Sequence, residues 1–118
     1  MSYDLAFWKY KRDVRVDHLG IYVRLSEGEV VDEVEELPVS GIMERVKVAF
    51  SEGWKQLDDT TWHSDDGKAF FALTVTSQFF MVECKSMEGG DMNKIMDVAL
   101  EFGCALYDPQ VGKRFDGP

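Results

Sequence analysis

The chain has 118 residues, of which 45% are hydrophobic and 13% aromatic, and its 22 acidic and 13 basic residues give a formal net charge of -9. This size and apolar content predict one folded domain spanning residues 1–118 and exclude an intrinsically disordered chain. The negative charge opposes binding to nucleic-acid phosphate and to anionic membranes and favours basic partners, although it also serves solubility alone.

No apolar run approaches the roughly 18 to 20 residues that cross a bilayer. The N-terminus also lacks the basic region and the small-residue cleavage site of a secretory signal. We therefore expect a cytoplasmic protein, with Cys84 and Cys104 as reduced, buried thiols.

The first segment predicts a strand at 3–10. Tyr3, Leu5 and Phe7 alternate on one of its faces, and Trp8 and Tyr10 lie on the other. A strand with large apolar side chains on both faces is expected in the interior of a sheet.

Residues 16–26 fit two structures, because their apolar residues alternate as in a strand and also fall on one face of a helix. We favour a helix that Asp17 caps and Gly28 ends. The next positions hold six acidic residues among ten, which predicts a solvated surface loop. These residues are Glu27, Glu29, Asp32, Glu33, Glu35 and Glu36.

After the Leu37-Pro38 break, Ser40 is a candidate N-cap for a helix at 41–51 that ends before Gly53. Its expected core face has helical spacing. The residues of that face are Ile42, Val46, Ala49 and Phe50.

Between residues 54 and 85 the apolar period changes to two, which predicts an antiparallel meander. It contains a short run at 60–63 and strands at 68–76 and 79–85, with Asp66-Gly67 as a two-residue hairpin turn. Its inward side chains are expected to be Phe71, Leu73, Val75, Phe80, Val82 and Cys84.

Asp91 is the candidate cap of a helix at 92–102, which Gly103 ends before a short apolar strand at 104–107. The inward side chains of this helix are expected to be Met92, Ile95, Met96, Ala99 and Leu100. The predicted order β-α-α-β-β-β-α-β defines an α+β domain, with a mostly antiparallel sheet and helices packed on one side.

The sequence contains no motif for catalysis, for a cofactor or for a metal. It lacks the close cysteine or histidine pairs of zinc sites, the acidic spacing of calcium loops and the glycine-rich loops that bind nucleotides. Cys104 and His63 are the one nucleophile and base pair considered, and Cys104 is more simply explained as a small core residue. We assign no catalytic, cofactor-binding or metal residue, and a small hydrolase remains the enzymatic alternative.

We therefore predict a binding protein, whose partner contacts the acidic loop together with two acidic turns. Aromatic side chains near these loops are candidate anchors, because a few desolvated aromatic residues commonly carry the affinity of an interface. The alternative is that the acids only solvate the surface and the aromatics fill the core. Beyond the six acids of the loop, the candidates are Asp58, Asp59, Asp65, Asp66, Trp54, Trp62 and Tyr107.

Three segments resemble a group of small bacterial proteins of the YDLxFWK…LYDPQ kind. They are Tyr3-Asp4-Leu5-Ala6-Phe7-Trp8-Lys9, the stretch 28–54, and Glu101-Phe102-Gly103-Cys104-Ala105-Leu106-Tyr107-Asp108-Pro109-Gln110. Several members of this group resemble immunity proteins of polymorphic or contact-dependent toxin systems. The resemblance implies a cytoplasmic protein that binds and blocks a cognate toxin domain, often a nuclease. A regulatory domain with a different protein partner is the alternative.

Overall fold

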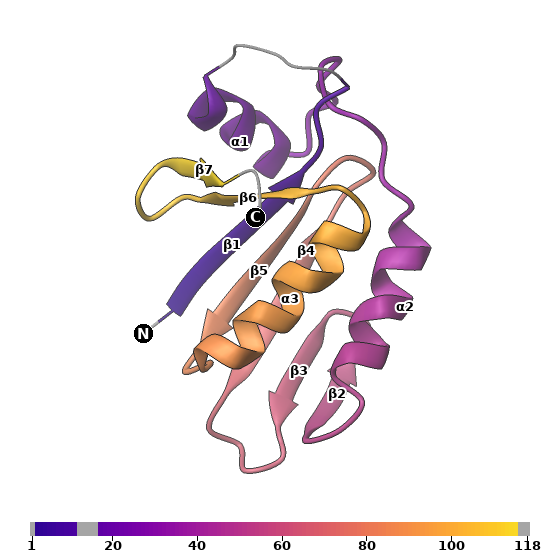
Figure 1. Cartoon of the computed structure of the whole chain (residues 1–118), viewed down its shortest axis with the longest axis vertical. Helices are drawn as coiled ribbons and strands as arrows, with labels where there is room; N and C mark the ends of the chain where they lie inside the picture. Colours follow the sequence, from indigo (N-terminus) through magenta and orange to yellow (C-terminus); the bar gives the residue numbers. More distant parts are fainter. Residues whose placement is uncertain (1, 12–16, 116–118) are drawn as a thin grey trace.

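The computed structural model describes residues 2–11 and 17–115. The described residues form three helices and one seven-stranded antiparallel sheet, which confirms the α+β class (Figure 1). In chain order the elements are β1 (Ser2–Trp8), α1 (His18–Ser26), α2 (Val39–Ala49), β2 (Trp54–Asp58), β3 (Thr61–Ser64), β4 (Phe70–Val75), β5 (Phe80–Lys85), α3 (Gly89–Glu101), β6 (Ala105–Asp108) and β7 (Lys113–Phe115).

The strand order is β2-β3-β4-β5-β1-β6-β7, so β1 lies between β5 and β6. The prediction of an interior N-terminal strand is confirmed. Two strands, β2 and β7, were not predicted as separate elements. Four of the five residues of β2 are exposed and β7 has only three residues, so neither carries an apolar period of two.

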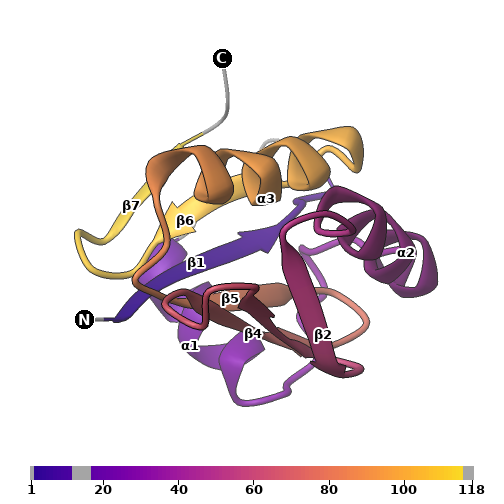
Figure 2. The same ribbon diagram turned by 90° about the horizontal axis from the view of Figure 1, so that it is seen from below.

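Helices cover both faces of the sheet, which corrects the expectation that they all pack on one side (Figure 2). α2 and α3 bury Ile42, Val46, Ile95 and Val98 against the face of β1 that carries Phe7. On the opposite face, α1 buries Ile21 and Leu25 against Ala6, Trp8, Phe79 and Tyr107. Because β1 is apolar on both faces, each face requires a cover.

The helix at 16–26 is confirmed as α1, although residue 16 lies outside the described part of the chain. The carboxylate of Asp17 accepts a hydrogen bond from the Leu19 N–H at 3.2 Å, as expected of an N-cap. Gly28, with φ of 83°, follows the last turn in a left-handed conformation that suits glycine.

The expected caps of the other two helices are wrong. The N-caps are Pro38 for α2 and Glu88 for α3, so each helix begins before the predicted Ser40 and Asp91. The C-terminus of α3 is as predicted. The Gly103 N–H donates to the Leu100 carbonyl and the Cys104 N–H to the Ala99 carbonyl, which is the Schellman pattern.

The turn between β3 and β4 is longer than the predicted Asp66-Gly67 hairpin. The Ser64 N–H donates to the Ala69 carbonyl at 2.9 Å, and the Ser64 hydroxyl accepts from the Ala69 N–H at 3.0 Å. The four residues 65–68 therefore form the loop. In this turn the Asp66 carboxylate accepts from the Ser64 hydroxyl at 2.5 Å and from the Lys68 N–H at 2.9 Å.

None of the helices in the described ranges has the length and apolar character needed to cross a membrane.

Candidate functional site

The acidic loop, defined here as residues 27–36 between α1 and α2, is held by the side chain of Gln78. Its amide oxygen accepts from the Val31 N–H at 2.8 Å, and its amide nitrogen donates to the carbonyls of Val31 at 2.7 Å and Val34 at 2.9 Å. The side chains of Val31 and Val34 are fully buried in the core beneath α1. Hydrogen bonds and apolar burial therefore fix the middle of the loop from inside.

Main-chain bonds fix the second half of the loop against the end of β1. The Lys11 N–H donates to the Glu33 carbonyl at 2.9 Å, and the Glu35 N–H donates to the Lys9 carbonyl at 2.8 Å. Between them, Tyr10 and Val34 form an isolated antiparallel bridge. The acidic loop is thus paired to the sheet like a short additional strand.

Val31 and Val34 point inward, whereas Val30 and most of the carboxylates of the acidic loop face solvent. Five of the six are exposed, and Glu35 is half-buried in an ion pair with Lys9 at 3.3 Å. Glu29 makes a longer contact of 3.8 Å with Arg24. The other exposed acids form no ion pair with any residue that the structure describes. These acids are Glu27, Asp32, Glu33 and Glu36.

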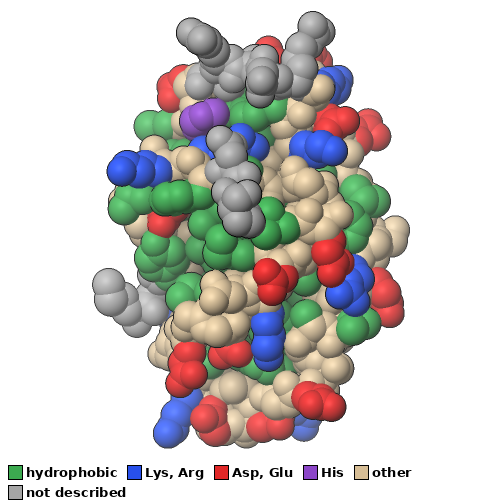
Figure 3. Space-filling model, in the orientation of Figure 1, with side chains coloured by type: hydrophobic (Ala, Val, Ile, Leu, Met, Phe, Trp, Pro, Cys, Tyr) green, Lys and Arg blue, Asp and Glu red, His purple; other side chains and the backbone are tan. Residues whose placement is uncertain are grey.

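The acidic turns are also exposed but do not all join this surface. The turn with Asp65 and Asp66 lies at the opposite end of the 43 Å long axis from the acidic loop, and acids appear at both ends of the face in Figure 3. Asp58 is the last residue of β2, and Asp59 lies in the turn that follows it. Hydrogen bonds lower the pKa of Asp58, mainly from the Thr60 main chain, and that of Asp66, mainly from the Ser64 hydroxyl. These carboxylates stabilise turns locally.

Two of the three predicted aromatic anchors are wrong, because Trp62 and Tyr107 are only 1% and 0% exposed. The Trp62 ring stacks on Phe71 with centroids 5.0 Å apart, and Tyr107 packs on Trp8 at 5.3 Å. Both are core side chains and are not available to a partner in this conformation. Trp54 is half-buried and remains partly accessible.

The candidate nucleophile and base do not meet. Cys104 lies in the core under α2 and α3, whereas His63 lies on the other face of β3, and three strands separate β3 from β6. Burial raises the pKa of the Cys84 thiol to about 12 and that of Cys104 to about 11, which disfavours the reactive thiolate. Within the described residues, no three potential metal ligands cluster together.

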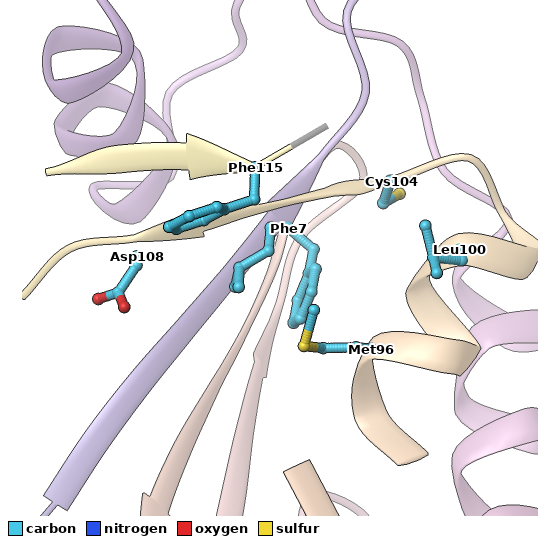
Figure 4. A pocket seen from close by; sticks show the side chains of 7 residues that line it. Phe7, Met96, Leu100, Cys104, Asp108 and Phe115 are labelled. Carbon is cyan, nitrogen blue, oxygen red and sulfur yellow. The ribbon is translucent and has the colours of Figure 1, made fainter. Parts of the chain in front are cut away.

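An apolar pocket lies between α3 and the hairpin of β6 and β7, and sequence reasoning missed it (Figure 4). Its volume is about 340 Å³. The lining residues come from four elements and from the turn after α3. No sequence pattern distinguishes them from ordinary core or strand residues. They are Phe7, Met96, Leu100, Cys104, Leu106, Asp108 and Phe115.

The two end segments of the family resemblance contact each other directly. The Tyr3 hydroxyl donates a hydrogen bond to the Asp108 carboxylate, and the Gln110 side chain bonds to the main chain of Asp4. Tyr107 packs on Trp8 beside them. These residues therefore hold β1, β6 and the following turn together, which is a structural task.

No family model matches the chain, and no curated protein shows significant similarity to it. The resemblance to immunity proteins therefore stays a prediction that rests on the quoted segments.

Proposed function

We propose that this chain is a non-enzymatic binding protein that contacts a basic protein partner through the acidic loop. The resemblance of the three quoted segments makes toxin immunity the favoured role, in which the partner is a toxin domain with a basic, phosphate-binding groove. A regulatory domain that binds another basic protein is the alternative, and the same surface serves it.

The observation that carries the proposal is the way in which Gln78 fixes the acidic loop. An acidic segment that provides only solubility does not require a fixed main chain. Here Val31 and Val34 are buried, and the buried amide of Gln78 makes three hydrogen bonds to them. Holding the loop before contact lowers the conformational entropy lost on binding. The main chain that carries the carboxylates is therefore held in place before contact.

The charge of this surface selects the partner. Carboxylates facing outward repel phosphate, so nucleic acid and anionic membranes are unfavourable ligands. A protein surface rich in lysine and arginine is attracted, and steering of this kind raises the association rate more than the affinity. In a nuclease toxin, an acidic surface of this kind would occupy the groove that otherwise binds the nucleic-acid backbone.

The test is affinity capture from the native cell, with quantification of captured proteins by mass spectrometry. Three baits are compared at low salt: the unchanged chain, a loop variant and a control variant that lowers the charge equally elsewhere. The loop variant is Glu27→Gln, Glu33→Gln and Glu36→Gln. The control is Glu44→Gln, Glu52→Gln and Asp97→Asn, all exposed acids outside the loop.

The proposal predicts a basic protein that the unchanged chain and the control variant retain and that the loop variant loses. Identification of that protein as a toxin domain would separate immunity from regulation. Equal capture by the loop and control variants would contradict the proposal.

A further inference from the structure

The apolar pocket is open and is bordered by apolar side chains that solvent reaches. Leu100 on α3 is 40% exposed and Phe115 on β7 is 46% exposed, and both line the pocket. Figure 3 shows hydrophobic side chains gathered over β1, β6 and β7 on this face. An exposed apolar hollow of this kind commonly marks a contact site on an otherwise polar surface.

The pocket adjoins the acidic loop through Lys9. The Lys9 ammonium pairs with Glu35 of the loop at 3.3 Å. The same side chain lies across Gly103, where an added Cβ would be 3.2 Å from the Lys9 Nζ. Gly103 precedes Cys104, which lines the pocket. The Lys9 side chain therefore lies between the acidic loop and the residue that precedes the pocket, and Glu35 balances its charge.

The polar end of the pocket is a single carboxylate with a fixed orientation. Asp108 accepts hydrogen bonds from the Tyr3 hydroxyl and from the Gln110 side-chain amide, the latter at 2.5 Å. Lys113 lies opposite Asp108 in the hairpin, so the charge at this end is balanced. The excess negative charge lies on the side of the acidic loop.

We infer that the pocket receives one large apolar side chain from the same basic partner, and the inference rests on the proposed function. Interfaces obtain most of their affinity from a few anchors seated in desolvated pockets, whereas charges at the rim govern the approach. Trp62 and Tyr107 are buried and cannot act as such anchors for this chain. The chain supplies the pocket, therefore, and the partner supplies the anchor with basic residues beside it.

Three short peptides test the inference without knowledge of the partner. The probe is acetyl-Lys-Trp-Lys-amide. In acetyl-Lys-Ala-Lys-amide the anchor is missing, and in acetyl-Glu-Trp-Glu-amide the charge is reversed. Each is titrated into the isotopically labelled full chain, and amide chemical shifts are followed by NMR.

The Lys-Trp-Lys peptide is expected to bind with millimolar affinity and to shift the amides of the residues lining the pocket. Loss of the anchor or reversal of the charge is each expected to weaken binding about tenfold. Equal binding of the Trp and Ala peptides, or shifts that map outside the pocket, would overturn the inference. Equal binding of the charge-reversed peptide would contradict the inference that the partner carries basic residues beside its anchor.

A matched pair of variants separates the pocket from general apolar contact. Leu100→Lys places a positive charge in the wall of the pocket, where it repels the lysines of the peptide. Leu57→Lys makes the same change at an exposed leucine on β2, at the far edge of the sheet. Both positions are exposed, so both variants are expected to fold, which circular dichroism checks. Leu100→Lys should weaken the Lys-Trp-Lys peptide about tenfold and Leu57→Lys should not, and equal effects would refute the pocket. Failure here with continued loss of partner capture by the loop variant would leave the proposed function standing.

Discussion

The side-chain amide of Gln110 hydrogen-bonds to both main-chain groups of Asp4. Its oxygen accepts from the Asp4 N–H at 2.8 Å and its nitrogen donates to the Asp4 carbonyl at 3.0 Å. Continuation of the register between β1 and β6 would place Pro109 opposite Asp4, and proline has no N–H to donate. The glutamine side chain therefore takes the place of a strand residue where β6 ends.

Gln110→Ala should lower the free energy of unfolding by about 1–2 kcal/mol, because it removes the two bonds to Asp4 and a third to Asp108 from a solvent-accessible site. Urea denaturation measures the change. Gln56→Ala, an exposed glutamine on β2, is the control and should change stability by less than about 0.5 kcal/mol. Equal effects of the two substitutions would mean that the side-chain hydrogen bonds of Gln110 contribute nothing to stability.

Gln78→Ala should cost more, about 3 kcal/mol, because it leaves the Val31 N–H and the Val34 carbonyl without their partner in a buried site. It also removes one of the two hydrogen bonds that the Val31 carbonyl accepts, and the other, from the Val34 N–H, remains. The Val31 amide should also exchange with solvent faster relative to amides in the centre of the sheet. Hydrogen exchange followed by NMR measures this local effect. Unchanged protection of Val31 in a folded variant would show that the loop is held by its valines alone.

Trp62→Ala should lower the free energy of unfolding by about 3–5 kcal/mol, as expected for removal of a large side chain from a close-packed core. Trp54→Ala should cost less, because Trp54 is half-buried. Thermal unfolding of both variants tests the order. A stable Trp62→Ala variant with lost partner binding would restore Trp62 as an anchor.

Stability should fall as pH rises above about 9. The buried thiols keep their protons up to a pKa of about 11 for Cys104 and about 12 for Cys84, whereas the ordinary value is 9.0. A raised folded-state pKa stabilises the fold fully below pH 9.0, and this contribution is lost as pH rises toward the folded values. Burial also raises the pKa of Tyr22, which acts in the same direction.

The double variant Cys84→Ala, Cys104→Ala should be less stable near neutral pH but should lose less stability per pH unit above 9.0. Urea midpoints measured across this range give the two slopes. Identical slopes would show that the thiols titrate alike in the folded and unfolded chains.

The fold could be predicted where the residue pattern is long and regular. The alternation in 3–10 placed β1 correctly, and helical spacing with Gly103 as the stop placed α3. The second core was not predicted, because the period of α1 does not show which face of the sheet it covers. The early starts of α2 and α3 were missed because their N-caps, Pro38 and Glu88, are not preferred capping residues and make no side-chain capping bond.

The candidate site was only partly predictable. The acidic composition identifies the loop as exposed, but nothing near Gln78 signals that its amide reaches across 47 positions to Val31. The burial of Trp62 and Tyr107 also depends on tertiary packing, since an aromatic residue in a short strand suits a core and an interface equally. The pocket arises where α3 meets the β6 and β7 hairpin, and β7 itself was not expected.

The most direct test of the central claim is the association rate of the chain with the captured partner, measured by stopped flow at about 20 and about 200 mM salt. The loop variant with Glu27→Gln, Glu33→Gln and Glu36→Gln should associate about tenfold more slowly at low salt, with a flatter salt dependence. The control variant with Glu44→Gln, Glu52→Gln and Asp97→Asn has the same net charge and should change the rate much less. Equal rates for the two variants, or an association rate indifferent to salt, would contradict the proposed role of the acidic loop.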